Sequence, residues 1–298
     1  MIGAPPVLTY AQAASADRGS AVILSSEISE RQARLAGDDL NDAGALQSLI
    51  DSLHAALERD EFELHYQPTV DVDTRRIAGL EALIRWRSPE RGLVNPNDFI
   101  PVLEETGLIV EVGRWALRRA TRDQGTWAAL GLPVPRVAVN VSAIELRQPD
   151  FVESVRDTLD GNQLIDLEIT ESRIMEDVGA NVDKFKRLHA LGVGIAIDDF
   201  GTGYSSLAYL AKLPVQTLKI AREFISRMLE DDETMAVVQT IISLADALKL
   251  DTIAEGVESE EQVDILALLR CDRIQGTITG RPLALREMTA LLQPALKA

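Results

Sequence analysis

The chain carries the stretch VGIAIDD at Val193–Asp199, followed by the turn-forming sequence FGTG at Phe200–Gly203. The apolar run is typical of a buried strand, and it ends in two adjacent acids. Burying an unpaired carboxylate costs free energy, so an acid at the end of a core strand requires a partner such as a cation, a metal ion or backbone N–H donors. The stretch therefore predicts a core strand that carries acidic side chains into a functional site.

The same arrangement recurs along the chain, where apolar, strand-like runs end in a carboxylate, an amide or a lysine. The terminal residues of these other runs are Glu81, Asn140, Glu168, Lys219, Glu255 and Gln275. Recurrence at seven runs of one chain predicts that the strand ends contribute to a single shared site.

Strand-like and helix-like segments alternate from Ala45 onward. The strand-like runs are Phe62–Val70, Ile77–Ile84, 136–141, 164–170, 193–198, 215–220, 251–255 and 272–275. Helical periodicity begins near Ala45 and returns at 98–105, 108–129, 144–159, 178–191, 204–212, 232–249, 259–270 and 285–292. The short polar connector Asp71–Arg76 is typical of a hairpin, so the first two strands are predicted to be antiparallel.

Alternation through eight strands indicates an α/β fold of the (β/α) barrel type. An open, doubly wound sheet is the alternative, but no Gly-x-Gly-x-x-Gly sequence follows the first strand to support a dinucleotide-binding fold. In a β/α barrel the C-terminal ends of the strands converge on one face, where active sites lie. The strand-end residues are therefore expected to share one rim.

The chemistry of this expected rim favours hard metal ions. With Asp199 included, it holds five carboxylates, two amides and one ammonium group, and no His or Cys. Oxygen ligands suit Mg²⁺ or Mn²⁺ rather than structural zinc, and divalent ions would neutralise carboxylates that otherwise repel one another. Adjacent Asp198 and Asp199 suit two ions about 3.5–4 Å apart, the arrangement used for phosphoryl displacement. Lys219 is then expected to orient the water nucleophile or to neutralise charge on the phosphate.

Simpler structural roles fit each of these residues taken alone. Glu168 and Asp198 would serve as caps of the helices that follow, and Lys219 as a strand-end lysine that extends into solvent. Such explanations must be repeated independently at seven strands, which weakens them. A barrel glycosidase with two catalytic carboxylates is another alternative, but it does not explain Lys219 beside the Asp198–Asp199 pair.

Composition argues against duplex DNA as a partner. The chain has 47 acidic and 30 basic residues, a net charge of −17 and a sequence pI of about 4.6. Duplex DNA is bound through basic patches, so no DNA partner is expected. A small anionic ligand remains compatible if metal ions or a few well-placed Arg and Lys residues set the local field.

The sequence favours a reducing, aqueous compartment. Cys271 is the single cysteine, so no intrachain disulfide is possible. No apolar stretch approaches the ~20 residues that span a bilayer, and no basic region precedes an apolar one at the N-terminus. We expect a cytoplasmic protein, or the cytoplasmic part of a larger and membrane-anchored one.

Several motifs stand in an order that resembles one known family. They are Tyr66–Pro68 (YQP), Glu81–Trp86 (EALIRW), Val139–Ser142 (VNVS), Leu167–Ser172 (LEITES), Asp198–Ser206 (DDFGTGYSS), Leu218–Ile220 (LKI), Ala254–Glu258 (AEGVE), Gln275–Gly276 and Gly280–Pro282 (GRP). Together they resemble the EAL domain family, the phosphodiesterases of cyclic di-GMP. The resemblance spans about residues 46–296.

The resemblance implies a fold and a division of the chain. The family has a modified TIM (β/α)8 barrel with one antiparallel strand, in agreement with the predicted hairpin. Residues 46–298 are accordingly expected to form an EAL phosphodiesterase domain. Residues 1–45, rich in Ala, Ser, Asp and Arg, are expected to be a linker or the remnant of an upstream domain, partly helical and partly disordered.

The resemblance also implies roles for the rim residues, with Mg²⁺ or Mn²⁺ in a two-metal site. The residues that resemble ligands of the first metal are Glu81, Asn140, Glu168 and Asp198. Those that resemble ligands of the second are Asp198, Asp199 and Glu255, with Asp198 bridging. Lys219 matches the lysine that contacts the nucleophilic water, and Glu255 is also a general-base candidate.

Further positions match the substrate site and its support. Gln67, Arg85 and Gln275 match positions near the substrate, where Arg85 would contact a phosphate. Glu171 and the Asp199–Ser206 loop match the element that orders the metal site and couples it to a dimer interface. A homodimer is therefore expected, and an upstream sensory or GGDEF-type domain is compatible with the full-length protein.

Two departures from the family pattern bear on activity. Ala221 stands where the family usually has an Asp two residues after the lysine, and Thr277–Thr279 replace the usual aromatic residues. The sequence thus predicts metal-dependent hydrolysis of cyclic di-GMP to linear pGpG. The alternative is a weakly active or inactive EAL module that binds cyclic di-GMP or a protein partner as a sensor.

Overall fold

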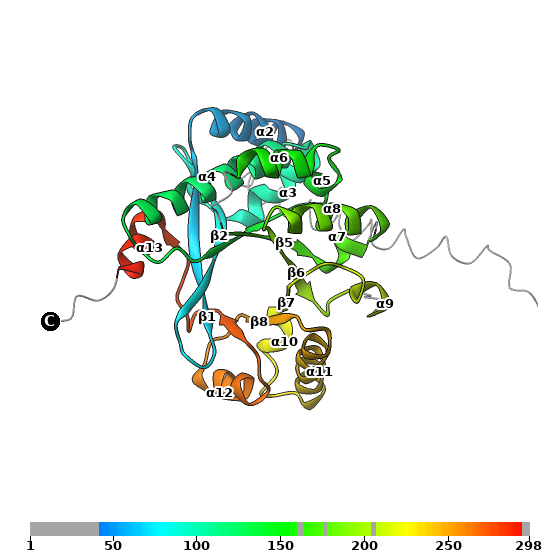
Figure 1. Ribbon diagram of the computed structural model, residues 1–298. Coiled ribbons are helices and arrows are strands. Elements are labelled where there is room, and N and C mark those ends of the chain that lie inside the picture. Colours follow the sequence, from blue (N-terminus) through cyan, green and yellow to red (C-terminus); the bar gives the residue numbers. More distant parts are fainter. Residues whose placement is uncertain (1–41, 160–163, 176–177, 204–206, 294–298) are drawn as a thin grey trace, which may run out of the picture.

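A closed barrel of eight strands forms the centre of the computed structural model, which describes residues 42–159, 164–175, 178–203 and 207–293 (Figure 1). The strands are β1 (Phe62–Asp71), β2 (Ile77–Ser88), β4 (Arg136–Asn140), β5 (Ile165–Thr170), β6 (Gly194–Phe200), β7 (Thr217–Ile220), β8 (Asp251–Glu255) and β9 (Arg273–Gln275). β1 runs antiparallel to both β2 and β9, whereas β2 and β4–β9 are mutually parallel. The predicted modified TIM barrel with one antiparallel strand is confirmed.

Helices surround the strands in Figure 1. They are α2 (Asp42–Glu58), α3 (Pro96–Thr106), α4 (Ile109–Ala129), α5 (Ala143–Arg147), α6 (Phe151–Thr158), α7 (Glu171–Met175), α8 (Val178–Ala190), α9 (Leu207–Leu210), α10 (Arg222–Ile225), α11 (Asp232–Leu248), α12 (Glu260–Leu268) and α13 (Leu285–Leu292). Within the described ranges, no helix is long and apolar enough to cross a membrane.

The structure departs from the sequence-based elements in several places, and the short helices α7 and α10 were not predicted. The helix predicted over 144–159 is two helices, α5 and α6, because Pro149 lies between them and the residue before a proline is driven out of the helical region. The helix predicted over 204–212 is described only as α9, since 204–206 lie outside the described residues. Two short strands, β3 (Gly92–Val94) and β10 (Leu283–Ala284), pair antiparallel with β2 and β1 and carried no clear signal.

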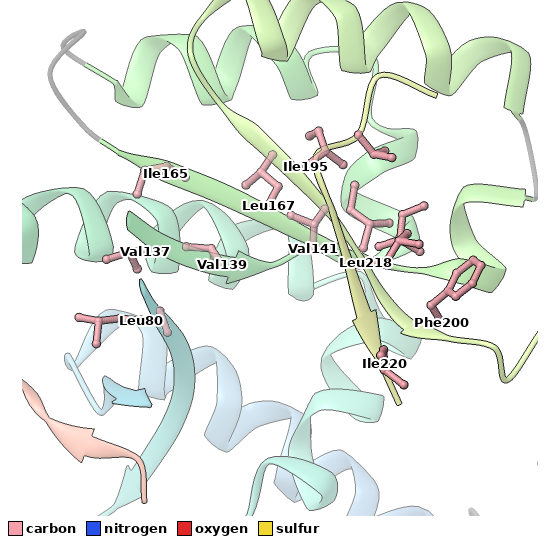
Figure 2. Close-up of a cluster of buried hydrophobic side chains, with 14 of the residues drawn as sticks. Leu80, Val137, Val139, Val141, Ile165, Leu167, Ile195, Phe200, Leu218 and Ile220 are labelled. Carbon is pink, nitrogen blue, oxygen red and sulfur yellow. The ribbon is translucent and has the colours of Figure 1, made fainter. Parts of the chain in front are cut away.

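Two apolar clusters hold the elements in place. The larger one joins the parallel strands to their helices, and Figure 2 shows its strand residues, among them Leu80, Val137, Leu167 and Leu218. Parallel strands are buried on both faces, which explains why they read as continuous apolar runs. The smaller cluster joins α2, α3 and the start of α4 to the outer ends of β1 and β2.

A buried carboxyl group lies where α5 packs on α4. Glu145 closes a capping box with Ser142, accepting the Ser142 backbone N–H at 2.9 Å, while Ser142 Oγ accepts the Glu145 N–H at 3.2 Å. Its carboxyl group occupies the space that a Cβ at Gly113 would fill. Burial raises the pKa of Glu145 from 4.5 to about 7.

This shift predicts a pH-dependent stability. Because the folded state binds the Glu145 proton more tightly than the unfolded state does, the free energy of unfolding falls as pH rises from 4.5 to about 7. Glu145→Gln keeps the acceptor oxygen without the charge, so at pH 8 it should be more stable than wild type by ~1–3 kcal/mol. Urea unfolding at pH 4.5 should show no such gain. If the free energies of unfolding of the two proteins change with pH in parallel, the prediction is contradicted. Glu230→Gln, at an exposed position, serves as the control.

Candidate metal centre

A lysine lies at the centre of the rim formed by the C-terminal ends of the parallel strands. Lys219 on β7 is fully buried. Its Nζ is 2.6 Å from Glu255 Oε1, 2.8 Å from Glu168 Oε2, 3.3 Å from Asp198 Oδ1 and 3.6 Å from Glu81 Oε2. These carboxylates come from four different strands, β8, β5, β6 and β2. The structure therefore brings together the acids that the sequence placed at strand ends.

Asp199 joins the centre through an irregularity in β6. The pairing of β6 with β7 shifts between Ile197 and Phe200, and Asp199 adopts a left-handed backbone with φ 51°. Consecutive strand residues normally point to opposite faces, and a bulge changes that alternation. As a result, Asp198, Asp199 and Glu255 each present an oxygen atom within 4.8 Å of the others. This trio corresponds to the set assigned by resemblance to the second metal.

Amide side chains fix the orientation of Glu81. Asn140 Nδ2 donates to Glu81 Oε1 at 2.8 Å, and Gln275 Nε2 donates to Glu81 Oε2 at 2.5 Å. Gln275 Nε2 also lies 3.3 Å from Gln67 Oε1, while Gln67 Nε2 donates to the Gly280 carbonyl at 3.0 Å. The carboxylate of Glu81 is thus held from both sides by the ends of β4 and β9.

The electrostatics of the centre follow from burial and crowding. Burial disfavours the charge of Lys219, but the surrounding carboxylates raise its pKa well above the usual value. Burial and then the charge of Glu81 raise the pKa of Glu168 well above its usual range. Burial likewise raises the pKa of Glu255 to about 7, although Lys219 opposes the shift. For Glu81, burial is outweighed by Lys219 and the two amides, so its pKa is lowered.

These donor atoms fit hard divalent cations. Glu168 Oε2 and Asp198 Oδ1 are buried oxygens that both face the single Lys219 ammonium, at 2.8 and 3.3 Å. A single ammonium cannot neutralise the four carboxylates around it together with Asp199. Carboxylate and amide oxygens are the ligands that Mg²⁺ and Mn²⁺ prefer. The residue set therefore fits a metal centre without an added ligand from elsewhere in the chain.

Glu171 lies beside the carboxylate cluster and supports the loop after β6. Its side chain is almost fully buried in α7, and its Oε2 accepts the Gly201 N–H at 2.8 Å. A Cβ at Gly203 would lie 2.8 Å from Glu171 Oε1, so the loop packs closely on this carboxylate. The contacts indicate that Glu171 holds the backbone that follows Asp199.

Arg85 lies farther out on β2, four residues beyond Glu81. Its side chain is half-buried, and its Nη1 donates to the Ile84 carbonyl at 2.9 Å. Burial lowers the pKa of Arg85, and the nearby charges of Glu81 and Glu63 oppose this shift. The guanidinium is thus close enough to Glu81 for its charge to affect the pKa of Arg85. Among the described ion pairs, none joins Arg85 to the carboxylates around Lys219.

Sequence reasoning missed the first turn of α10, which lies at the same rim. Ala221 is buried at the N-cap of this helix and provides no side-chain cap. Glu223 lies near enough to Asp199 to add to the rise in the pKa of Asp199 that burial and Asp198 produce. Arg222 and Glu223 come two and three residues after Ile220, the end of β7, and that position was the available signal.

The fold and the centre define a barrel protein with an acidic, metal-compatible site on the C-terminal face of its strands. The sequence model of the EAL domain family matches residues 50–282. This match covers most of the chain, and the chain therefore belongs to the EAL domain family.

Two similar proteins come from Pseudomonas aeruginosa. The bifunctional diguanylate cyclase/cyclic di-GMP phosphodiesterase MucR is 43% identical over 247 residues, which are 81% of this chain and 36% of MucR. The cyclic di-GMP phosphodiesterase NbdA is 40% identical over 247 residues, 82% of this chain and 32% of NbdA. The chain thus spans about a third of the length of these relatives.

Solved structures share the fold. The PaMucR phosphodiesterase in complex with c-di-GMP is 42% identical, with a TM-score of 0.78 over 81% of this chain and 99% of that chain. The EAL enzyme Bd1971, with cAMP and cyclic di-GMP bound, is 32% identical, with a TM-score of 0.79 over 94% of this chain and 77% of that chain.

The central ion cluster predicts how Lys219 affects stability. Lys219→Met leaves buried carboxylates without their cation, so in EDTA the variant should lose ~3–5 kcal/mol of unfolding free energy. Mn²⁺ should restore more stability to this variant than to wild type, because the ion takes over neutralisation. Thermal and urea unfolding with EDTA or Mn²⁺ measure both effects. Exposed Lys186→Met is the control, and equal stabilities of all three proteins in EDTA would refute the assignment.

Proposed function

We propose that this protein is a metal-dependent phosphodiesterase that hydrolyses cyclic di-GMP to linear pGpG and so lowers this second messenger in bacterial signalling. The observation that carries the proposal is the convergence of Glu81, Glu168, Asp198 and Glu255 on Lys219. The family membership and the cyclic di-GMP phosphodiesterases among the relatives support the same substrate. A site with its full set of acids does not favour the alternative of an inactive sensing module.

Two divalent ions, Mg²⁺ or Mn²⁺, would share the centre. Glu81, Asn140, Glu168 and Asp198 would hold the first, while Asp198, Asp199 and Glu255 would hold the second. Bound there, the ions would neutralise the carboxylates and act as Lewis acids toward the phosphate oxygens.

The chain's own side chains would supply the remaining chemistry. Glu255, whose Oε1 lies 2.6 Å from Lys219 Nζ, is the general-base candidate. Lys219 would orient the attacking water and balance negative charge that develops on phosphorus. The water oxygen forms a new P–O bond, the bond to a ribose 3′ oxygen breaks, and that oxygen receives a proton.

Other side chains would bind substrate or hold the site in shape. Arg85 would contact a phosphate, and Gln67 and Gln275 would lie near the substrate while they steady Glu81. Glu171 would act as a positioning residue, through its hydrogen bond to the loop that carries Asp199.

We also propose how the unit is used. Residues 46–298 would form the catalytic domain and residues 1–45 a linker or the remnant of an upstream domain. The matched segment makes up only 36% of MucR and 32% of NbdA, and MucR is described as bifunctional, which supports an upstream sensory or GGDEF-type domain. The protein would act as a homodimer in the cytoplasm.

The decisive experiment is a turnover assay. Purified protein with Mn²⁺ should convert cyclic di-GMP to pGpG, and Glu81→Ala or Asp198→Ala should lower the rate by about a thousandfold or more, because several kcal/mol of metal-dependent stabilisation are lost. Exposed Asp264→Ala should retain the wild-type rate. Intact cyclic di-GMP after incubation with the wild type, beside a control enzyme that linearises it, would exclude the proposed activity.

Ala221 allows a sharper test of metal affinity. It lies two residues after Lys219 and is almost fully buried, so Ala221→Asp should cap α10 and add a carboxylate beside the centre. The Mn²⁺ concentration for half-maximal activity should fall about threefold to tenfold, an effect of ~1 kcal/mol. Ala221→Asn supplies the cap without the charge. If Ala221→Asp and Ala221→Asn lower the half-maximal Mn²⁺ concentration equally, the added charge is irrelevant. If neither variant lowers it, the departure from the family pattern does not affect metal affinity.

A further inference from the structure

The short helix α10 packs between two glycine-containing loops at the rim of the metal centre. Phe224 packs on Gly201, where an added Cβ would come within 2.8 Å of its ring. On the other side, Arg222 packs on Gly256, where a Cβ would lie 2.2 Å from Arg222 Cγ. Both glycines have positive φ, 100° at Gly201 and 70° at Gly256. The two loops follow β6 and β8, the strands that carry Asp198 and Glu255.

Arg222 is held in a defined position at this rim. Its aliphatic stem lies over Gly256, which directly follows Glu255, and its Nη2 donates to Glu258 Oε1 at 2.8 Å. The guanidinium nevertheless remains open to solvent, with 70% of the side chain exposed. Glu258 uses one side of the planar group, so other N–H donors stay available to a ligand.

The charge balance of the rim calls for such a cation. Two divalent ions and Lys219 would balance the five carboxylates of the centre, so the two phosphodiester charges of the proposed substrate still approach a chain with a net charge of −17. A negative field repels an anionic substrate unless local cations offset it.

Arg222 complements Arg85 across the barrel. Arg85 follows Glu81 on β2, whereas Arg222 follows β7, and β4, β5 and β6 separate these strands in the sheet order. Two cations on opposite sides of the centre can hold an anion that spans it, whereas one cation cannot fix its orientation.

We propose that Arg222 is a substrate-binding residue that contacts the anionic cyclic dinucleotide at the rim, with Glu258 orienting its guanidinium; this inference rests on the proposed function. Arg222 acts on substrate affinity rather than on bond cleavage, since its guanidinium is solvent-exposed and pairs with Glu258 rather than with the carboxylates around Lys219.

The competing interpretation is an ordinary surface ion pair between Arg222 and Glu258. Exposed pairs of this kind contribute little to folding, so stability alone cannot separate the two roles. Substrate affinity can, because a purely structural pair has no reason to change it.

The test compares Arg222→Ala, Arg222→Lys and Arg227→Ala by their KM and kcat for cyclic di-GMP with Mn²⁺. Arg227 lies on the turn that follows α10, pairs with Asp231 and is 68% exposed, so it matches Arg222 in charge and exposure. Arg222→Ala should raise KM about tenfold, as expected for a lost charge-assisted hydrogen bond, and should leave kcat within about twofold. Arg222→Lys should restore KM to within about threefold. The defect should shrink as salt is raised from 50 to 500 mM, because screening weakens an exposed charge.

Each outcome bears on the inference. Equal KM values for Arg222→Ala and Arg227→Ala, or a fall in kcat without a change in KM, would overturn it. If the wild type does not hydrolyse cyclic di-GMP, the proposed activity fails, and the dissociation constants of the same variants from calorimetry decide the role of Arg222. A wild type that neither hydrolyses nor binds the nucleotide overturns both.

Discussion

The contact between one buried ammonium group and four carboxylates is the constraint on which the site depends. Lys219 has no solvent around it, so its charge is tolerable only because Glu81, Glu168, Asp198 and Glu255 face it. The same burial makes the acids depend on Lys219. Such a cluster is expensive to desolvate and contributes little net stability. Its value lies in carboxylate oxygens that are already arranged for cations before any cation binds.

The backbone around this cluster is adapted to bring charges together. Asp199 accepts a left-handed conformation that costs on the order of 1 kcal/mol for a residue with a Cβ, and in return both acids of the Asp198–Asp199 pair reach the rim. Gly201 and Gly256 allow side chains of α10 to lie directly on the backbone. Left-handed backbone at Asp199 and close approach at Gly201 and Gly256 thus accompany the functional end of the barrel.

Much of this architecture is readable in the sequence. Buried parallel strands are apolar throughout, so runs such as Val193–Ile197 and their polar last residues predicted both the barrel and its rim. The break at Pro149 was equally visible but was overridden by the helical periodicity on both sides. The hydrogen bonds of Glu81 with Asn140 and Gln275 were not predictable, because they depend on the register of three strands distant in sequence. The placement of Arg222 at the rim was not predictable, because it depends on packing against Gly256, which is 34 residues away in the sequence.

The reversed direction of β1 changes where the chain enters the barrel. In an ordinary (β/α)8 barrel the first strand starts at the end remote from the active site. Here Phe62, at the start of β1, pairs with Trp86, beyond Glu81 on β2. The apolar cluster that seats α2 includes both residues, so the helix that leads into the barrel sits at the same pole as the metal centre. A displacement of α2 would therefore act on the pole of the barrel that carries the metal centre, without having to cross the body of the barrel.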